Sequence, residues 1–155
     1  MGVVSTMAVA NAILQECARR KTSCTPEKLQ QLLYIFCCLF LSYAEKPLFS
    51  EEFLVGKRGP FLPSVDWKFK CFRWRKINTY AKDAMGNVYT MDLASSAAAR
   101  HAMADMCELW MPAPEASIAC VLCSPDTGWA KAGYYGETIK AEGMRSDVDL
   151  FLRKR

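Results

Sequence analysis

Residues 32–41 read LLYIFCCLFL, the longest apolar run in the chain. Ten residues are too few to cross a bilayer, which takes about 20. Because the run has no polar face, it predicts a helix buried at the centre of its domain. The preceding Thr25-Pro26-Glu27 is a helix start signal, since threonine caps, proline fits the first helical position and an acid suits the positive end of the helix dipole.

Further helices are expected on both sides of this central segment. Apolar residues at helical spacing predict a first helix that begins after Ser5 or Thr6. Ser64 is expected to cap a second helix that reaches Trp74, and Ser95 or Ser96 a third that ends near Trp110. Short helices are expected over residues 115–122 and 147–152, the latter followed by the basic tail 153–155.

Two segments with strand-like residues predict a small β-hairpin. Residues 77–80 and 88–91 flank Met85-Gly86-Asn87, a sequence typical of a turn. The Gly and Pro residues at positions 56, 59, 60 and 63 are expected to exclude regular structure there. The pattern as a whole predicts a mainly α (α+β) fold, in which a compact helical bundle surrounds the central helix and carries one hairpin.

Length and composition favour one globular domain spanning residues 1–155. The chain is 52% apolar and 23% charged, which excludes extensive disorder. No internal repeat or long linker divides it. Eight cysteines follow a start that lacks the basic and apolar pattern of a secretion signal, so we expect reduced thiols and a cytoplasmic protein with no membrane partner.

Signals for catalysis, metals and cofactors are weak. The single histidine, His101, has no nucleophile near it in sequence, so no catalytic residue is assigned and no enzyme is expected. Cys120 and Cys123 lie one helical turn apart, and core packing is favoured over a redox or zinc role, which stays open. The glycines around Lys57 and Arg58 lack the GK[ST] ending of a phosphate loop. No metal or cofactor is therefore expected.

The most unusual composition lies in residues 57–82, where eight Lys and Arg residues accompany one acid, Asp66. Aromatic residues are interleaved with these cations. Such a segment could bind an acidic protein partner or, less favoured, a nucleic acid. The alternative is that it has no binding role and forms a solvated basic face over aromatic residues of the core. The candidate partner-binding residues are Lys57, Arg58, Phe61, Trp67, Lys70, Arg73, Trp74 and Arg75. Gly59, Pro60 and Pro63 would form a rigid turn that presents them.

Several motifs occur in an order typical of a known family. They are Val9-Ala10-Asn11-Ala12-Ile13-Leu14, Leu29-Gln30-Gln31-Leu32-Leu33-Tyr34, Pro47-Leu48-Phe49, Glu51-Glu52-Phe53, Gly59-Pro60-Phe61-Leu62-Pro63 and Asp126-Thr127-Gly128-Trp129-Ala130-Lys131-Ala132. Over residues 7–149 this order resembles the Panacea domain, the family of SocA-type and phage-associated GepA-type antitoxins. The most specific part is the Leu-Gln-x-Leu-Leu-Tyr helix followed by Gly-Pro-x-x-Pro.

The resemblance implies a function and a setting. It implies a compact helical domain without cofactor or enzymatic activity, which binds and neutralises a toxin or hands a target to a protease. It also implies a bacterial cell or a phage-infected host. Two alternatives stay open beside the antitoxin: a phage-encoded inhibitor that blocks a host defence complex, and a nucleic-acid-binding module that uses residues 57–82.

Overall fold

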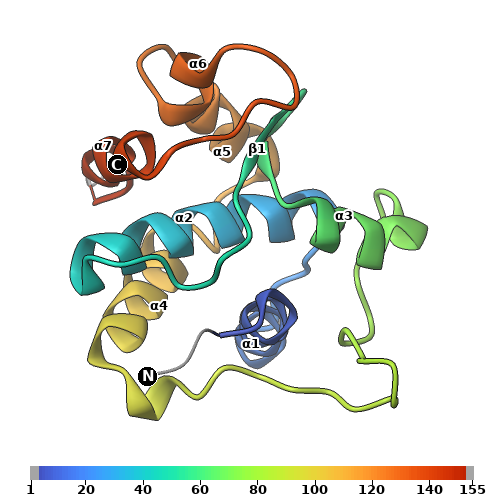
Figure 1. Ribbon diagram of the computed structural model, residues 1–155. Helices are drawn as coiled ribbons and strands as arrows, with labels where there is room; N and C mark the ends of the chain where they lie inside the picture. Colours follow the sequence, from blue (N-terminus) through green and yellow to red (C-terminus); the bar gives the residue numbers. More distant parts are fainter. Residues whose placement is uncertain (1–3, 153–155) are drawn as a thin grey trace.

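The apolar run forms part of α2 (Pro26–Ala44), which passes through the middle of the computed structural model (Figure 1). The model describes residues 4–152, so the basic tail lies outside the described residues. The predicted start of α2 is confirmed, because the Thr25 hydroxyl accepts a hydrogen bond from the Lys28 backbone N–H at 3.2 Å. Residues 31–41 are buried without interruption, as expected for a helix with no polar face.

The fold is mainly helical, with one small antiparallel sheet, as the sequence predicts. Helices pack around α2 from several directions, and α4, α7 and α1 make its principal contacts (Figure 1). The described elements besides α2 are α1 (Thr6–Arg19), β1 (Leu54–Gly56), β2 (Gly59–Phe61), α3 (Pro63–Phe69), η1 (Lys70–Phe72), η2 (Leu93–Ser95), α4 (Ala97–Leu109), α5 (Glu115–Leu122), α6 (Gly128–Ala132) and α7 (Ala141–Leu152). Among them no helix is long and apolar enough to span a membrane.

A buried polar junction fastens the C-terminal helices to α2. The Tyr34 hydroxyl donates a hydrogen bond to Asp147 Oδ2 at 2.6 Å, and the Gly128 N–H at the start of α6 donates to the same carboxylate at 3.0 and 3.1 Å. Burial raises the pKa of Asp147, and the bonds from Tyr34 and Gly128 oppose that rise. Since buried polar groups cost free energy unless they are hydrogen-bonded, these bonds fix α2, α6 and α7 together.

The hairpin lies elsewhere than predicted. β1 and β2 pair Leu54 with Phe61 and Gly56 with Gly59, within the segment for which regular structure was wrongly excluded. Gly59 adopts a φ of +131°, a region that favours glycine, and Lys57 and Arg58 form the turn. The free edge of β1 bonds to a later segment, since the Val55 N–H donates to the Glu137 carbonyl at 2.8 Å.

Residues 77–80 and 88–91 do not form the predicted strands. The turn between them is present, because the Asp83 N–H donates to the Asn87 carbonyl at 2.9 Å. The flanking backbone instead bonds to α1: the Asn11 side chain donates to the Ala81 and Tyr89 carbonyls and accepts from the Ala81 N–H. The Ile77 N–H donates to the Cys24 carbonyl and the Met91 N–H to the Ala8 carbonyl, so both segments bond to other parts of the chain and the hairpin prediction is wrong here.

Several helix boundaries also differ from expectation. Ser5 precedes α1 without a capping hydrogen bond from its side chain. The helix that Ser64 was expected to cap is α3, which begins one residue earlier, at Pro63. Its cap is the Glu51 carboxylate, which accepts hydrogen bonds from the Ser64 N–H and hydroxyl. It ends at Phe69, where η1 continues. The short helix α6 was not predicted, and the final helix is longer than expected. Ser96 caps α4 and Pro114 precedes α5, as predicted.

Adding a methyl group at Gly128 should destabilise the fold. A Cβ there would meet Tyr34 Oη at 2.9 Å and Asp147 Oδ2 at 3.1 Å, both held by hydrogen bonds. We expect Gly128→Ala to lower the free energy of unfolding in urea by about 1–3 kcal/mol, as overpacking does. Arg145→Ala, at an exposed position of α7, is the control and should change it by less than about 0.5 kcal/mol. Equal stability of the two variants would contradict the junction described above.

Candidate functional site

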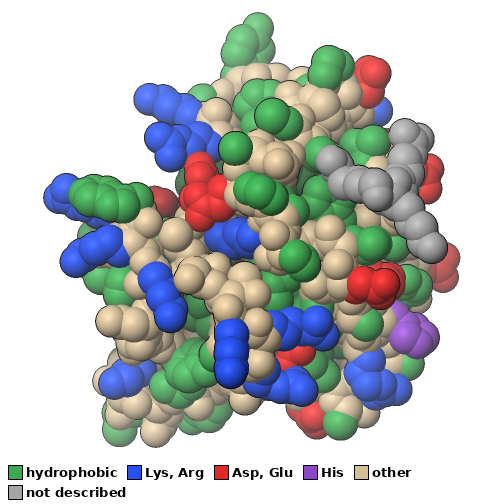
Figure 2. All heavy atoms as spheres, turned by 180° about the vertical axis from the view of Figure 1, so that it is seen from behind, with side chains coloured by type: hydrophobic (Ala, Val, Ile, Leu, Met, Phe, Trp, Pro, Cys, Tyr) green, Lys and Arg blue, Asp and Glu red, His purple; other side chains and the backbone are tan. Residues whose placement is uncertain are grey.

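The residues assigned to partner binding lie along one side of the molecule. We name as the basic-aromatic face the set Lys57, Arg58, Phe61, Trp67, Lys70, Arg73, Trp74 and Arg75. It extends from the β1–β2 turn along α3 to the turn after η1. Figure 2 shows Lys and Arg side chains gathered on the side of the molecule to which α3 belongs, with few acidic side chains among them. The structure therefore keeps the cations of this segment at the surface.

The aromatic residues of this segment divide into two groups. Phe69 is buried and Phe72 half-buried, so these rings belong to the core. Trp67 and Trp74 are 78% and 76% exposed, although tryptophan usually buries most of its surface. The interpretation as a solvated basic face over core aromatics thus accounts for the phenylalanines and leaves both tryptophans unexplained.

Arg73 holds a strained backbone in the turn before Trp74. Its φ of 56° and ψ of −112° are unfavourable for a residue with a side chain, at a cost of about 1–3 kcal/mol. Neighbouring hydrogen bonds maintain this turn. The Arg75 N–H donates to the Phe72 carbonyl at 2.9 Å, and the Arg75 guanidinium donates to the Cys71 carbonyl at 3.0 Å. Arg75 therefore supports the turn, while its neighbours Arg73 and Trp74 are presented to solvent.

A groove of about 440 Å³ brings half of the face together at the N-terminal end of α2. Its lining includes Lys57, Arg58, Phe61 and Arg73, together with Gly59 and Pro60 of the predicted rigid turn. Trp67, Lys70, Trp74 and Arg75 are not among the lining residues, so the face consists of a groove and an adjoining exposed tryptophan surface. On the groove wall, the Phe61 ring stacks with that of Tyr135, with centroids 6.4 Å apart.

Gln30 attaches this part of the face to the central helix. Its side-chain N–H donates to the Leu62 carbonyl at 3.1 Å, and its oxygen accepts from the Leu62 N–H at 2.9 Å. Both backbone groups of Leu62 are thereby satisfied by one amide, in the same way as in a β ladder. Leu62 joins β2 to Pro63, so the amide fixes the direction in which α3 leaves the hairpin.

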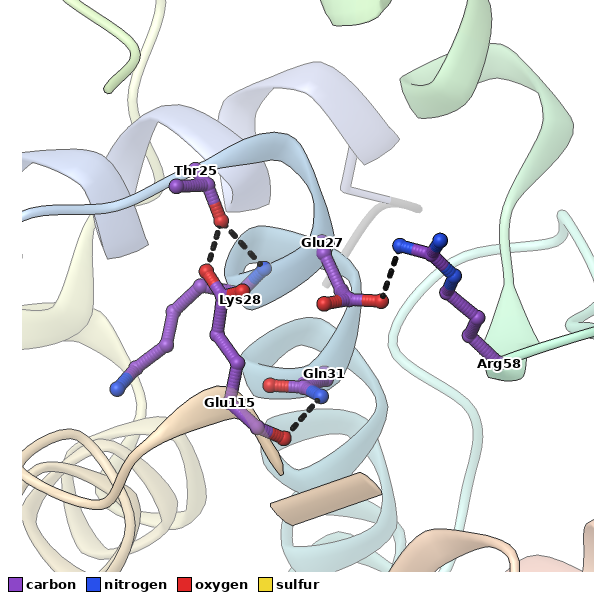
Figure 3. Close-up of polar contacts among 6 residues, drawn as sticks. All are labelled: Thr25, Glu27, Lys28, Gln31, Arg58 and Glu115. Atoms are coloured by element: carbon purple, nitrogen blue, oxygen red, sulfur yellow. Dashed lines mark hydrogen bonds and ion pairs between the residues drawn. The ribbon is translucent and has the colours of Figure 1, made fainter. Parts of the chain in front are cut away.

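Carboxylates meet the cations at the α2 end of the groove (Figure 3). Glu27 points toward Arg58, whose Nη1 lies 3.3 Å from Glu27 Oε1. Burial raises the pKa of Glu27, a hydrogen bond with the Glu115 carboxyl raises it further, and the Arg58 guanidinium opposes both effects. The Arg58 side chain is 82% exposed, so this ion pair is weak and leaves Arg58 open to exchange partners.

The remaining contacts of Figure 3 connect α2 to α5. The Thr25 hydroxyl donates to the Glu115 carboxylate, and the Gln31 side-chain N–H donates to the Glu115 carbonyl at 3.0 Å. The buried Gln31 oxygen has no hydrogen-bond partner. Lys28 turns away from Glu27 and donates to the Ala113 carbonyl.

Other sequence candidates lie away from the face. His101 is exposed on α4, where its ring contacts that of Tyr43. Cys120 is exposed and Cys123 half-buried at the end of α5, and burial raises the pKa of Cys123. Within residues 4–152, no three His, Cys, Asp or Glu side chains are arranged to hold a metal ion.

Sequence reasoning missed the α2 and Tyr135 contributions to the groove. Glu27 was interpreted as a helix-dipole residue, and Gln30 and Gln31 as part of a family signature. Two adjacent glutamines in an otherwise apolar helix were the available signal, because buried amides need fixed partners. Tyr135 gave no signal, since it reaches the groove from a loop far along the chain.

No protein-family model, curated protein or solved structure matches this chain. The resemblance to the Panacea domain stays a prediction from the motifs quoted above.

Replacing Gln30 should loosen the groove. Gln30→Met keeps the length of the side chain but leaves the Leu62 N–H without a partner, at a cost of about 1–3 kcal/mol, while the Leu62 carbonyl keeps its bond from the Asp66 N–H. We expect a lower free energy of unfolding and faster hydrogen exchange at the Leu62 amide. Gln15→Met, at an exposed position of α1, is the control. Unchanged exchange at Leu62 in Gln30→Met would show that this amide does not hold the groove.

Proposed function

We propose that this chain is a non-enzymatic binding protein whose basic-aromatic face recognises an acidic surface of a protein partner. The observation that carries the proposal is the exposure of Trp67 and Trp74, at 78% and 76%, among cationic side chains. Tryptophan and arginine dominate binding hot spots, because they combine large buried area with hydrogen bonding or charge. Two exposed tryptophans on one short segment provide such anchors.

The backbone of Arg73 supports the same proposal. Strain of about 1–3 kcal/mol persists only where the surrounding structure maintains it, and such residues cluster at functional sites. Here hydrogen bonds from Arg75 and Arg73 maintain it, with the Arg73 N–H donating to the Lys70 carbonyl at 3.1 Å. The strained turn presents Arg73 and Trp74 in a fixed orientation, which lowers the entropy cost of binding.

The partner class follows from the resemblance and from the charge of the face. An antitoxin-like protein would neutralise a toxin or deliver a target to a protease, and we propose this role first. A phage-encoded inhibitor would use the same face to block a host defence complex. Both roles need a partner with an acidic patch that complements Arg58, Arg73 and their neighbours.

Affinity capture from the native host tests the proposal. The tagged chain should retain one protein in a stoichiometric amount, and charge reversal by Lys70→Glu with Arg73→Glu should abolish the capture. Arg145→Glu, at an exposed cation on α7, is the control. Capture that survives the double reversal means that the surface is wrongly assigned. A nucleic acid retained instead, with affinity that falls steeply with salt, would favour nucleic-acid binding.

Truncating the tryptophans should separate binding from folding. Trp67→Ala and Trp74→Ala remove exposed side chains, so each should change the free energy of unfolding by less than about 0.5 kcal/mol. Each should weaken partner binding by about 2 kcal/mol or more, roughly thirtyfold, in titration calorimetry. Tyr89→Ala removes an aromatic ring that is 59% exposed outside the face and should leave affinity unchanged. Equal affinities for all three variants would count against the face.

Arg73→Gly should show that strain is retained for binding. Glycine relieves about 1–3 kcal/mol of backbone strain at this position. It also loses about 0.5–1 kcal/mol more in chain entropy on folding, so the free energy of unfolding should stay equal or rise. Affinity for the captured partner should fall at least tenfold. Lys76→Gly, at a residue without a positive φ, should not raise stability. A clear loss of stability in Arg73→Gly would mean that the turn is unstrained.

A further inference from the structure

The end of α1 brings two cysteines together. The Lys21 N–H donates to the Ala18 carbonyl at 3.2 Å, and the Thr22 N–H donates to the Cys17 carbonyl at 2.9 Å. Lys21 has a φ of 55°, so these bonds form a Schellman motif that ends α1 and reverses the chain. The segment after it returns over the last turn of the helix, which places Cys24 beside Cys17.

Both cysteines line a cleft that opens at the surface. The cleft has a volume of about 470 Å³ and also includes Lys21, Lys76 and Tyr80, which are exposed. Cys17 and Cys24 themselves are 2% and 3% exposed, so they lie at its base. Because a water molecule takes about 30 Å³, the cleft has room for a small polar oxidant beside the two cysteines.

The local electrostatics distinguish the two sulfur atoms. The side-chain contact with Cys24 lowers the pKa of Cys17, burial opposes this effect, and the Lys28 ammonium lowers the pKa further. The same contact, together with burial, raises the pKa of Cys24. Cys17 is thus the more acidic thiol of the pair, and thiol reactivity increases with the fraction of thiolate.

The spaced pair suggested by the sequence lacks these features. Cys120 is exposed on α5, and burial raises the pKa of its neighbour Cys123. No lysine or arginine is among the causes that shift Cys123. The pair that the fold prepares for thiol chemistry is therefore Cys17 with Cys24, which are seven positions apart and carry no motif.

We propose that Cys17 and Cys24 form a redox-active thiol pair that a hydroperoxide oxidises to a disulfide. The Cys17 thiolate attacks the terminal oxygen of the hydroperoxide, the O–O bond breaks, and the alkoxide leaves as an alcohol after taking up a proton. Cys17 is then a sulfenic acid. The Cys24 sulfur attacks the Cys17 sulfur, the S–O bond breaks, and hydroxide leaves with the Cys24 proton as water. Two thiols are oxidised by two electrons in total and one hydroperoxide is reduced.

Hydrogen peroxide is the probe for this pair. The full-length chain, reduced and freed of reductant, is treated with one equivalent of hydrogen peroxide and analysed by intact mass and by peptide mapping without reduction. We expect the chain to lose the mass of two hydrogen atoms and the map to contain a peptide that links Cys17 to Cys24. Dithiothreitol should restore the original mass.

Variants assign the role of each sulfur atom. Cys17→Ser should abolish the mass loss, whereas Cys24→Ser should stop at the sulfenic acid, which dimedone traps on Cys17. Cys120→Ser with Cys123→Ser is the matched control and should form the same disulfide at the same rate. Oxidation at Cys17 should be about tenfold faster than at the exposed Cys71.

Several outcomes would overturn the proposal. One is a wild-type chain that gains the mass of oxygen at Cys71 or Cys120 and forms no disulfide between Cys17 and Cys24. Another is a disulfide between Cys120 and Cys123, or one from Cys17 to the neighbouring buried Cys107. Should a serine variant fail to fold, the peptide map of the wild-type chain and its dimedone adducts decide alone. None of these measurements depends on the proposed partner-binding function.

Discussion

The rest of the structure depends on the burial of α2 on every side. A helix without a polar face cannot lie on a surface, so each of its faces requires a covering element. α1, α4 and α7 supply most of that cover, and β2 and α5 supply the remainder near its N-terminal end. The few polar side chains that α2 carries inward are each tied to a distant part of the chain, as Gln30 is to Leu62 and Tyr34 to Asp147.

The sequence predicted those helix starts that depend only on neighbouring residues. The start of α2 at Thr25-Pro26 and of α4 after Ser96 follow from caps that are complete within a few residues, and both predictions are confirmed. The hairpin failed because pairing is not local. Residues 77–91 carry a real turn, but the Asn11 side chain occupies the backbone groups that a ladder would use. Gly59 and Pro60, interpreted as breakers, lie in β2, where Gly59 supplies the positive φ that the turn needs.

The candidate site was predictable in composition and not in shape. Counting charges was enough to single out residues 57–82, and the cations named there are exposed. The sequence could not place Trp74, which faces solvent, because α3 stops after Phe69 and the following turn changes direction. The groove could not be predicted from the sequence for a different reason. It joins Glu27 to Arg58 and Phe61 to Tyr135, contacts that exist only after the chain has folded.

The bond between Tyr34 and Asp147 spans 113 positions of the chain and has a consequence for biosynthesis. A ribosome adds about 5–20 residues per second, so the apolar α2 segment is made several seconds before the helix that covers it. During that interval the nascent chain exposes a long apolar stretch, and such transiently exposed surface is prone to aggregation. Once α7 has formed, it covers this stretch and removes it from solvent.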